Sequence, residues 1–96
     1  MKRDYATYQV SLKLLLYKRN KILVLKDEKG RFDLPGGRVD DVEHQTPLMD
    51  VLQREVREEL GSNINYEIET PIFQYRRRFE DQEMYIFVTV YKGIYL

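Results

Sequence analysis

Three glutamates, Glu55, Glu58 and Glu59, lie within the segment REVREELG. If this segment is helical, their spacing of i, i+3 and i+4 places the three carboxylates on one face of the helix. Clustered carboxylate oxygens suit Mg²⁺ or Mn²⁺, and magnesium sites of this kind usually complete their coordination with substrate phosphates. The segment therefore indicates a divalent-metal site. The alternative is a solvated acidic face, paired in part with Arg54 and Arg57.

Two glycines, Gly36 and Gly37, open the loop PGGRVDDVEHQ just before this segment. Because glycine has no side chain, its backbone can approach a ligand closely or present a carbonyl oxygen to a metal. The glycines therefore have a use beside a metal site, either in contacting a ligand or in presenting a carbonyl to the metal.

The loop and the glutamates together resemble the Nudix box, G-x5-E-x7-R-E-U-x-E-E-x-G-U, in which U is aliphatic. The matching residues are Gly37, Glu43, Arg54, Glu55, Val56, Glu58, Glu59 and Gly61. The preceding FDLPGGRV is similar to the usual approach to this motif. There are two departures: ten residues separate Glu43 from Arg54 in place of seven, and Ser62 replaces the final aliphatic residue.

The resemblance implies an α/β fold, the Nudix α/β/α sandwich with a mixed sheet. We expect a single domain over residues 1–96, with its box region at 37–62. Family members usually continue for several tens of residues, so the sandwich is expected to be incomplete at the C-terminus. Apolar sheet surface should then be exposed, which makes a homodimer possible. The insertion predicts that Glu43 lies away from the carboxylate cluster.

The resemblance also implies a role for each box residue. A divalent cation, Mg²⁺ or Mn²⁺, would be held by Glu55, Glu58, Glu59 and the Gly37 carbonyl. Glu55, Arg54 and Glu58 are the candidate catalytic residues, with Glu55 as the general base. Arg54 would orient carboxylates, or it would simply form an i,i+4 ion pair with Glu58.

The implied reaction is hydrolysis of the pyrophosphate of a nucleoside diphosphate linked to another group, such as a nucleotide or nucleotide-sugar. The alternative is a non-catalytic module that senses an ADP-ribose-like nucleotide or a protein partner. No substrate-binding residue is assigned, although Tyr17 or Phe32 could stack a nucleobase. The arginines at 76–78 are interpreted as a charged edge strand rather than a phosphate site, and His44 as a solvated loop residue.

The composition of the 96-residue chain argues against several classes of partner and of site. Its 16 basic and 16 acidic residues cancel, so no net field favours nucleic acid or membrane. It has no cysteine, which excludes a thiolate metal site and a cysteine nucleophile. No signal peptide or membrane span is evident, and a cytoplasmic protein is expected.

Strands and one helix must position the box residues. We predict strands at 8–19, 21–27, 64–79 and 84–96, with EDQE as the turn between the last two. The helix is predicted over 46–60, with Thr46 as N-cap, Pro47 as its first residue and Gly61 after its last turn. Its buried stripe is predicted to comprise Met49, Leu52, Val56 and Leu60.

Overall fold

The computed structural model describes residues 2–79 and 84–96, so the predicted turn EDQE lies outside the described residues. These described residues form seven strands, one short 3₁₀ helix (η1) and one α-helix. In order these are β1 (Gln9–Lys18), β2 (Lys21–Ile22), β3 (Leu25–Lys26), β4 (Phe32–Asp33), β5 (Gly36–Arg38), η1 (Asp41–Glu43), α1 (Leu48–Leu60), β6 (Tyr66–Phe79) and β7 (Met84–Tyr95).

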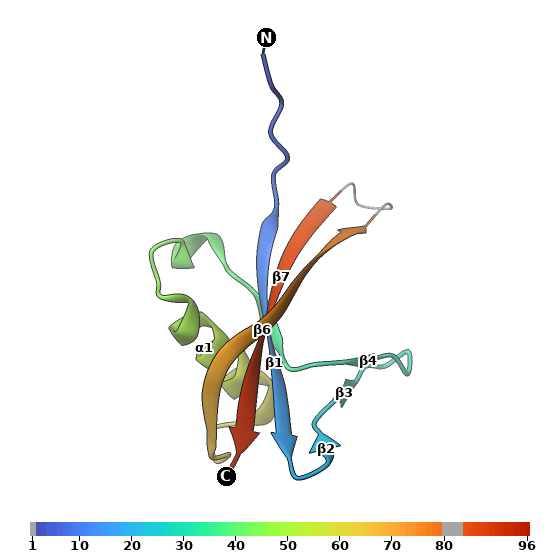
Figure 1. Ribbon diagram of the computed structural model, residues 1–96, viewed down its shortest axis with the longest axis vertical. Coiled ribbons are helices and arrows are strands. Elements are labelled where there is room, and N and C mark those ends of the chain that lie inside the picture. Colours follow the sequence, from blue (N-terminus) through green and yellow to red (C-terminus); the bar gives the residue numbers. More distant parts are fainter. Residues whose placement is uncertain (1, 80–83) are drawn as a thin grey trace.

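The main sheet is mixed, as predicted. Its strands follow the order β2-β1-β7-β6, and β5 also pairs with β1. The central pair, β1 and β7, is parallel, whereas β2, β5 and β6 are antiparallel to their neighbours. The short strands β3 and β4 form a separate hairpin on the side of the sheet opposite α1 in Figure 1. The sheet and α1 thus supply two layers of the predicted sandwich.

The helix packs on one face of the sheet through completely or almost completely buried aliphatic side chains. These side chains are Leu12, Leu14 and Leu16 of β1 and Val51, Leu52 and Val56 of α1. Leu52 and Val56 were predicted to be buried, but Met49 and Leu60 are only partly buried at the edge of this cluster. Val51 was not predicted. It lies one turn before Glu55, on the side of the helix where β5 and Val39 pack.

The helix ends at Gly61 as predicted, but it begins later than predicted. Gly61 has a positive φ of 85°, and its N–H donates to the carbonyl of Arg57 at 2.9 Å. The N-cap is Pro47, not Thr46, because Pro47 keeps an extended ψ of 138° and helical geometry starts only at Leu48. Thr46 instead belongs to the preceding turn, where its N–H donates to the carbonyl of Glu43.

The other face of the sheet carries a smaller apolar cluster formed by Ile86, Val88 and Val90 of β7. In the described part of the chain no helix packs on this face. Phe73 and Tyr75, which pair with Val90 and Val88, remain 49% and 37% exposed. Apolar surface is therefore exposed here, as predicted. No described helix is long and apolar enough to cross a membrane.

Candidate active site

The glycine loop lies so close to β1 that Gly36 cannot carry a side chain. Gly36 pairs with Lys13 of β1 and has a φ of 139°, which side-chain-bearing residues rarely adopt. A Cβ at this position would overlap the carbonyl oxygen of Leu12 and lie 2.8 Å from the Cα of Lys13. Gly36 is thus required by backbone contact as well as by conformation.

Gly37 has a different neighbour, the carboxylate of Glu55. A Cβ on Gly37 would overlap both carboxylate oxygens of Glu55, so this side chain lies directly against the glycine backbone. The Gly37 carbonyl oxygen accepts a hydrogen bond from the hydroxyl of Ser11 at 3.3 Å and retains a second lone pair. The loop and helix therefore meet at Glu55.

Glu59 meets the same loop one helical turn later. Its Oε1 accepts a hydrogen bond from the Gly36 backbone N–H at 2.6 Å. Burial raises the pKa of Glu59 above its ordinary value, although the Gly36 hydrogen bond and the positive charge of Lys13 oppose this shift. The charge of Glu55 also raises the Glu59 pKa. The negative charge of Glu55 therefore disfavours a negative charge on Glu59, and a cation bound between them would remove this effect.

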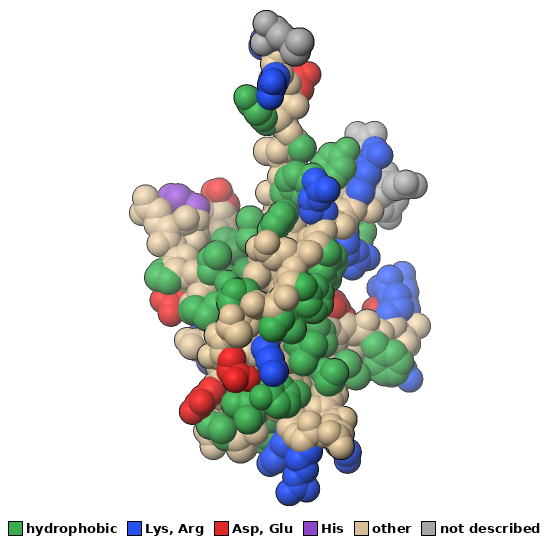
Figure 2. Space-filling model, in the orientation of Figure 1, with side chains coloured by type: hydrophobic (Ala, Val, Ile, Leu, Met, Phe, Trp, Pro, Cys, Tyr) green, Lys and Arg blue, Asp and Glu red, His purple; other side chains and the backbone are tan. Residues whose placement is uncertain are grey.

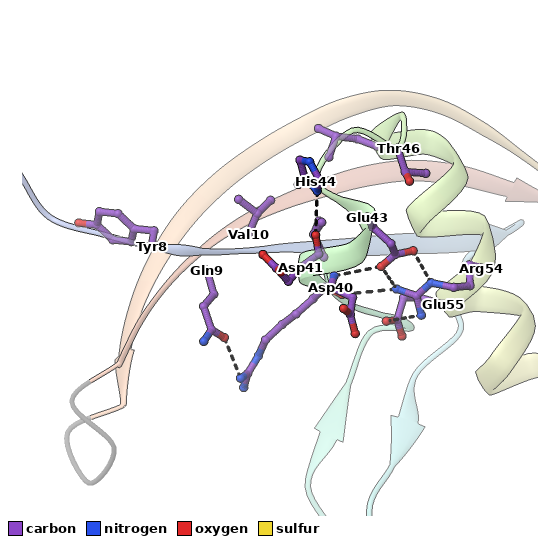
Figure 3. A pocket seen from close by; sticks show the side chains of 13 residues that line it. Tyr8, Gln9, Val10, Asp40, Asp41, Glu43, His44, Thr46, Arg54 and Glu55 are labelled. Atoms are coloured by element: carbon purple, nitrogen blue, oxygen red, sulfur yellow. Dashed lines mark hydrogen bonds and ion pairs between the residues drawn. The ribbon is translucent and has the colours of Figure 1, made fainter.

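Arg54 joins the remaining carboxylates. Its Nε and Nη2 each donate to one oxygen of Glu43 at 2.6 Å, which is a bidentate pair. Its Nη1 lies 2.8 Å from Glu55 Oε1 and 3.1 Å from Glu58 Oε2. Hydrogen bonding to Glu43 raises the pKa of Arg54, and the same interaction lowers the pKa of Glu43. Figure 3 shows Arg54 between Glu43 and Glu55.

Glu43, which precedes the insertion, was predicted to lie away from the carboxylate cluster, and its carboxylate lies against Arg54. Residues 41–43 form η1, and Asp40 and Glu43 make a reciprocal capping box around it. This turn directs the Glu43 carboxylate onto Arg54, so Glu43 is linked to the glutamate face through a guanidinium rather than separated from it. The side chain of His44 is exposed. Among the described residues, its only hydrogen-bond partner is the carbonyl of Asp41.

The box residues fall into two groups. Gly37, Glu55 and Glu59 come together at the glycine loop, whereas the Glu58 side chain is 58% exposed and pairs with Arg54. Over residues 2–79 and 84–96, no three acidic or histidine side chains are already gathered as a metal-binding group. The donors that could hold a cation are nevertheless all oxygens, which are the ligands that Mg²⁺ and Mn²⁺ prefer.

Two pockets adjoin the carboxylates. One, of about 760 Å³, is lined by Glu43, Arg54 and Glu55 and by the start of β1 (Figure 3). The other, of about 650 Å³, is lined by Glu59 together with the β3–β4 hairpin and the end of β6. Sequence reasoning did not assign the second pocket, because its walls are far apart along the chain. Of the three arginines at 76–78, Arg77 lines this pocket.

Comparison with known proteins identifies the family. The NUDIX domain model matches residues 7–94, while no curated protein sequence gives a significant match. A NUDIX hydrolase from Nitrosomonas europaea has a similar structure, with a TM-score of 0.74 and 15% identity over 94% of this chain and 60% of that one.

Two solution structures are also similar. The DNA mismatch repair protein MutT, a Nudix hydrolase from methicillin-resistant Staphylococcus aureus 252, has a TM-score of 0.63 and 20% identity over 92% of this chain and 68% of that one. The E. coli ORF135 protein has a TM-score of 0.65 and 21% identity over 88% of this chain and 59% of that one. Because the family model spans nearly the whole sequence, the chain belongs to the Nudix family.

Proposed function

We propose that the chain is a metal-dependent Nudix hydrolase that cleaves the pyrophosphate of a nucleoside diphosphate linked to another group. The observation that supports this proposal most directly is the convergence of Glu55 and Glu59 on the backbone of Gly36 and Gly37. Two carboxylates held at one glycine turn give a compact set of oxygen donors. Like charges at this spacing repel, and a bound cation would remove that repulsion.

The proposed ligands of the cation are Glu55, Glu59, Glu58 and the Gly37 carbonyl. The residues present fit this role, because Glu55 fills the space that a Cβ on Gly37 would occupy and burial already disfavours an isolated charge on Glu59. Glu58 would join the set on leaving its ion pair with Arg54. When bound, Mg²⁺ or Mn²⁺ would neutralise pyrophosphate charge and increase the acidity of an attacking water.

In this proposal Glu55 is the general base and Arg54 positions it. The Arg54 Nη1 lies 2.8 Å from one Glu55 oxygen, which restricts the side-chain rotamer and leaves the other oxygen to accept a proton. The bidentate pair with Glu43 holds the guanidinium in turn. Arg54 therefore acts through the glutamates and does not itself contact the reacting phosphate.

The metal site can be tested through stability. A cation present at ten times its dissociation constant should stabilise the native state by about 1.4 kcal/mol, which raises the melting temperature by about 6–11 °C. Glu59→Gln keeps the shape of the side chain but removes a charged ligand. It should abolish most of this shift for Mg²⁺ and Mn²⁺, whereas the matched control Glu67→Gln on β6 should retain it.

The reaction can be tested with a panel of nucleoside diphosphate derivatives, including nucleotide-sugars, assayed for phosphate-containing products. We expect Mg²⁺-dependent hydrolysis that Glu59→Gln abolishes. Glu55→Gln should reduce turnover more than metal binding if Glu55 is the base, and reduce both equally if it is chiefly a ligand. Full activity and an unchanged metal response in Glu59→Gln would show that the glutamates are a solvated helix face. Nucleotide binding without turnover would favour a sensing module.

A further inference from the structure

The pocket beside Glu59 is the strongest candidate for a substrate-binding site. Its volume is about 650 Å³, and it is lined by Glu59, Arg31, Phe32, Asp33, Arg77 and Phe79, among others. In Figure 2 the surface is hollowed between the sheet and the projecting β3–β4 hairpin, with acidic atoms inside the hollow and basic side chains around it. The pocket thus connects a proposed metal ligand with two aromatic rings and a set of cations.

Most of the charges around this pocket are already paired. Arg31 Nε lies 2.7 Å from Asp27, and Lys13 Nζ lies 2.9 Å from Asp33. The ion pairs of residues 2–79 and 84–96 include neither Glu59 nor Arg77. The pocket therefore presents a carboxylate on one wall and a guanidinium on another. A pyrophosphate would be attracted to both if a cation were bound at the carboxylate.

Arg77 is the one arginine of the triplet 76–78 that faces this pocket. Its pairing with Ile86 places it on the sheet face opposite α1, while Arg76 and Arg78 lie on the other face. Its guanidinium lies 4.8 Å from the ring centroid of Phe79. Stacking of this kind holds the guanidinium plane and leaves the N–H groups at its edge available to phosphate oxygens.

Phe32 supplies an exposed aromatic surface at the same pocket. Its side chain is 66% exposed, and the ammonium of Lys26 lies 5.7 Å from its ring centroid. Tyr17, the other residue considered for stacking a base, does not line the pocket. Its hydroxyl donates to Glu69 at 3.2 Å, and Lys92 lies over its ring. The structure therefore favours Phe32.

We propose that this pocket binds the nucleoside diphosphate part of the substrate, with Arg77 contacting a phosphate and Phe32 stacking against the nucleobase. The proposal rests on the proposed function for the placement of the pyrophosphate beside Glu59. The interactions themselves do not depend on turnover. Arginine binds phosphate through paired, charge-assisted hydrogen bonds, and base–aromatic stacking tolerates any base.

The test separates the two contacts by using three probes that the enzyme does not cleave in the presence of Mg²⁺. These are α,β-methylene-ADP, methylenediphosphonate and adenosine, titrated into the full chain by calorimetry or, for weak binding, NMR. Arg77→Ala should weaken binding of the two phosphonates by about 10- to 100-fold and leave adenosine unchanged. Phe32→Ala should weaken binding of the two adenine compounds by about tenfold and leave methylenediphosphonate unchanged.

Two control substitutions lie on β6, the strand that carries Arg77. Arg78→Ala removes the neighbouring arginine, which lies over Tyr85 on the opposite face, and Phe73→Ala removes another exposed phenylalanine that lies outside the pocket. Both variants should bind all three probes as the wild type does. Arg77→Lys keeps the charge without the planar fork and should restore only part of the affinity. Melting curves verify that each variant is folded.

Each outcome supports or overturns the assignment. If Arg77→Ala binds the phosphonates as tightly as Arg78→Ala does, or if the wild type binds neither phosphonate, the pocket is not the nucleotide site. Hydrolysis would then have to use other contacts, and the proposed function could still hold. If no substrate is hydrolysed but the binding losses occur as described, the hydrolase proposal fails and the nucleotide site stands.

Discussion

The close approach of the glycine loop to β1 makes Gly36→Ala the most informative single substitution. Two effects combine at this position. The φ of 139° is strained for any residue with a side chain, and a Cβ would overlap the backbone of Leu12 and Lys13. Backbone atoms of a central strand cannot move aside as the end of a flexible side chain can. We therefore expect a large loss of stability.

The magnitude follows from a comparison with Gly61. Gly61 also has a positive φ, 85°, but a Cβ there would meet nothing within 4 Å. Gly61→Ala should therefore cost only backbone strain, about 1–3 kcal/mol. Gly36→Ala should cost a similar strain plus about 1–3 kcal/mol of steric overlap. The total is a large part of the roughly 5–14 kcal/mol expected for a domain of this length.

The assay is urea unfolding monitored by circular dichroism, with wild type, Gly36→Ala and Gly61→Ala compared at one pH. We expect the unfolding midpoint of Gly36→Ala to lie on the order of 1 M below that of Gly61→Ala. Equal midpoints for the two variants would refute the reasoning, because they would show that the contact with β1 contributes nothing beyond the strained φ.

Three further predictions concern the carboxylates. Gly37→Ala should be less destabilising than Gly36→Ala, because the overlapping group is the end of the Glu55 side chain, but it should reduce the melting-temperature shift produced by Mg²⁺. Arg54→Met should lower the melting temperature at pH 7. Because Arg54 depresses the pKa of Glu43, the stability from this pair is present above the ordinary pKa of 4.5 and is lost as pH falls through the depressed value, so the two melting curves should converge in acid. The pH dependence of stability due to Glu59 has the opposite sign. Because the pKa of Glu59 is raised in the native state, protonation of Glu59 favours the native state. Without metal, wild type should therefore lose stability relative to Glu59→Gln as pH rises through the folded-state pKa, and a difference independent of pH would contradict this.

Local sequence signals were sufficient to predict much of the fold. The apolar spacing and Gly61 predicted a helix that differs from the observed α1 only at its start. Helical geometry begins after Pro47, because this residue has an extended ψ. Alternation and turn residues gave the long strands, and their order around the helix indicated the mixed sheet. These features depend on residues a few positions apart, so a linear reading can recover them.

The candidate site was predictable only in part. The spacing of Glu55, Glu58 and Glu59 placed all three on one helix face, but it could not show which of them meets the glycine loop. That depends on the pairing of β5 with β1, which brings Gly36 and Gly37 beneath the helix from a distant part of the chain.

The tertiary structure also decided the surroundings of the carboxylates. The insertion after Glu43 predicted that this side chain lies away from the carboxylate cluster, whereas η1, which precedes the insertion, brings the Glu43 carboxylate to Arg54. Phe32 and Arg77 are 45 positions apart, and nothing in their spacing relates them. They line one pocket because the β3–β4 hairpin and the end of β6 both border Glu59. The sequence by itself determined the chemical groups and their local order, whereas long-range strand pairing decided which groups share a site.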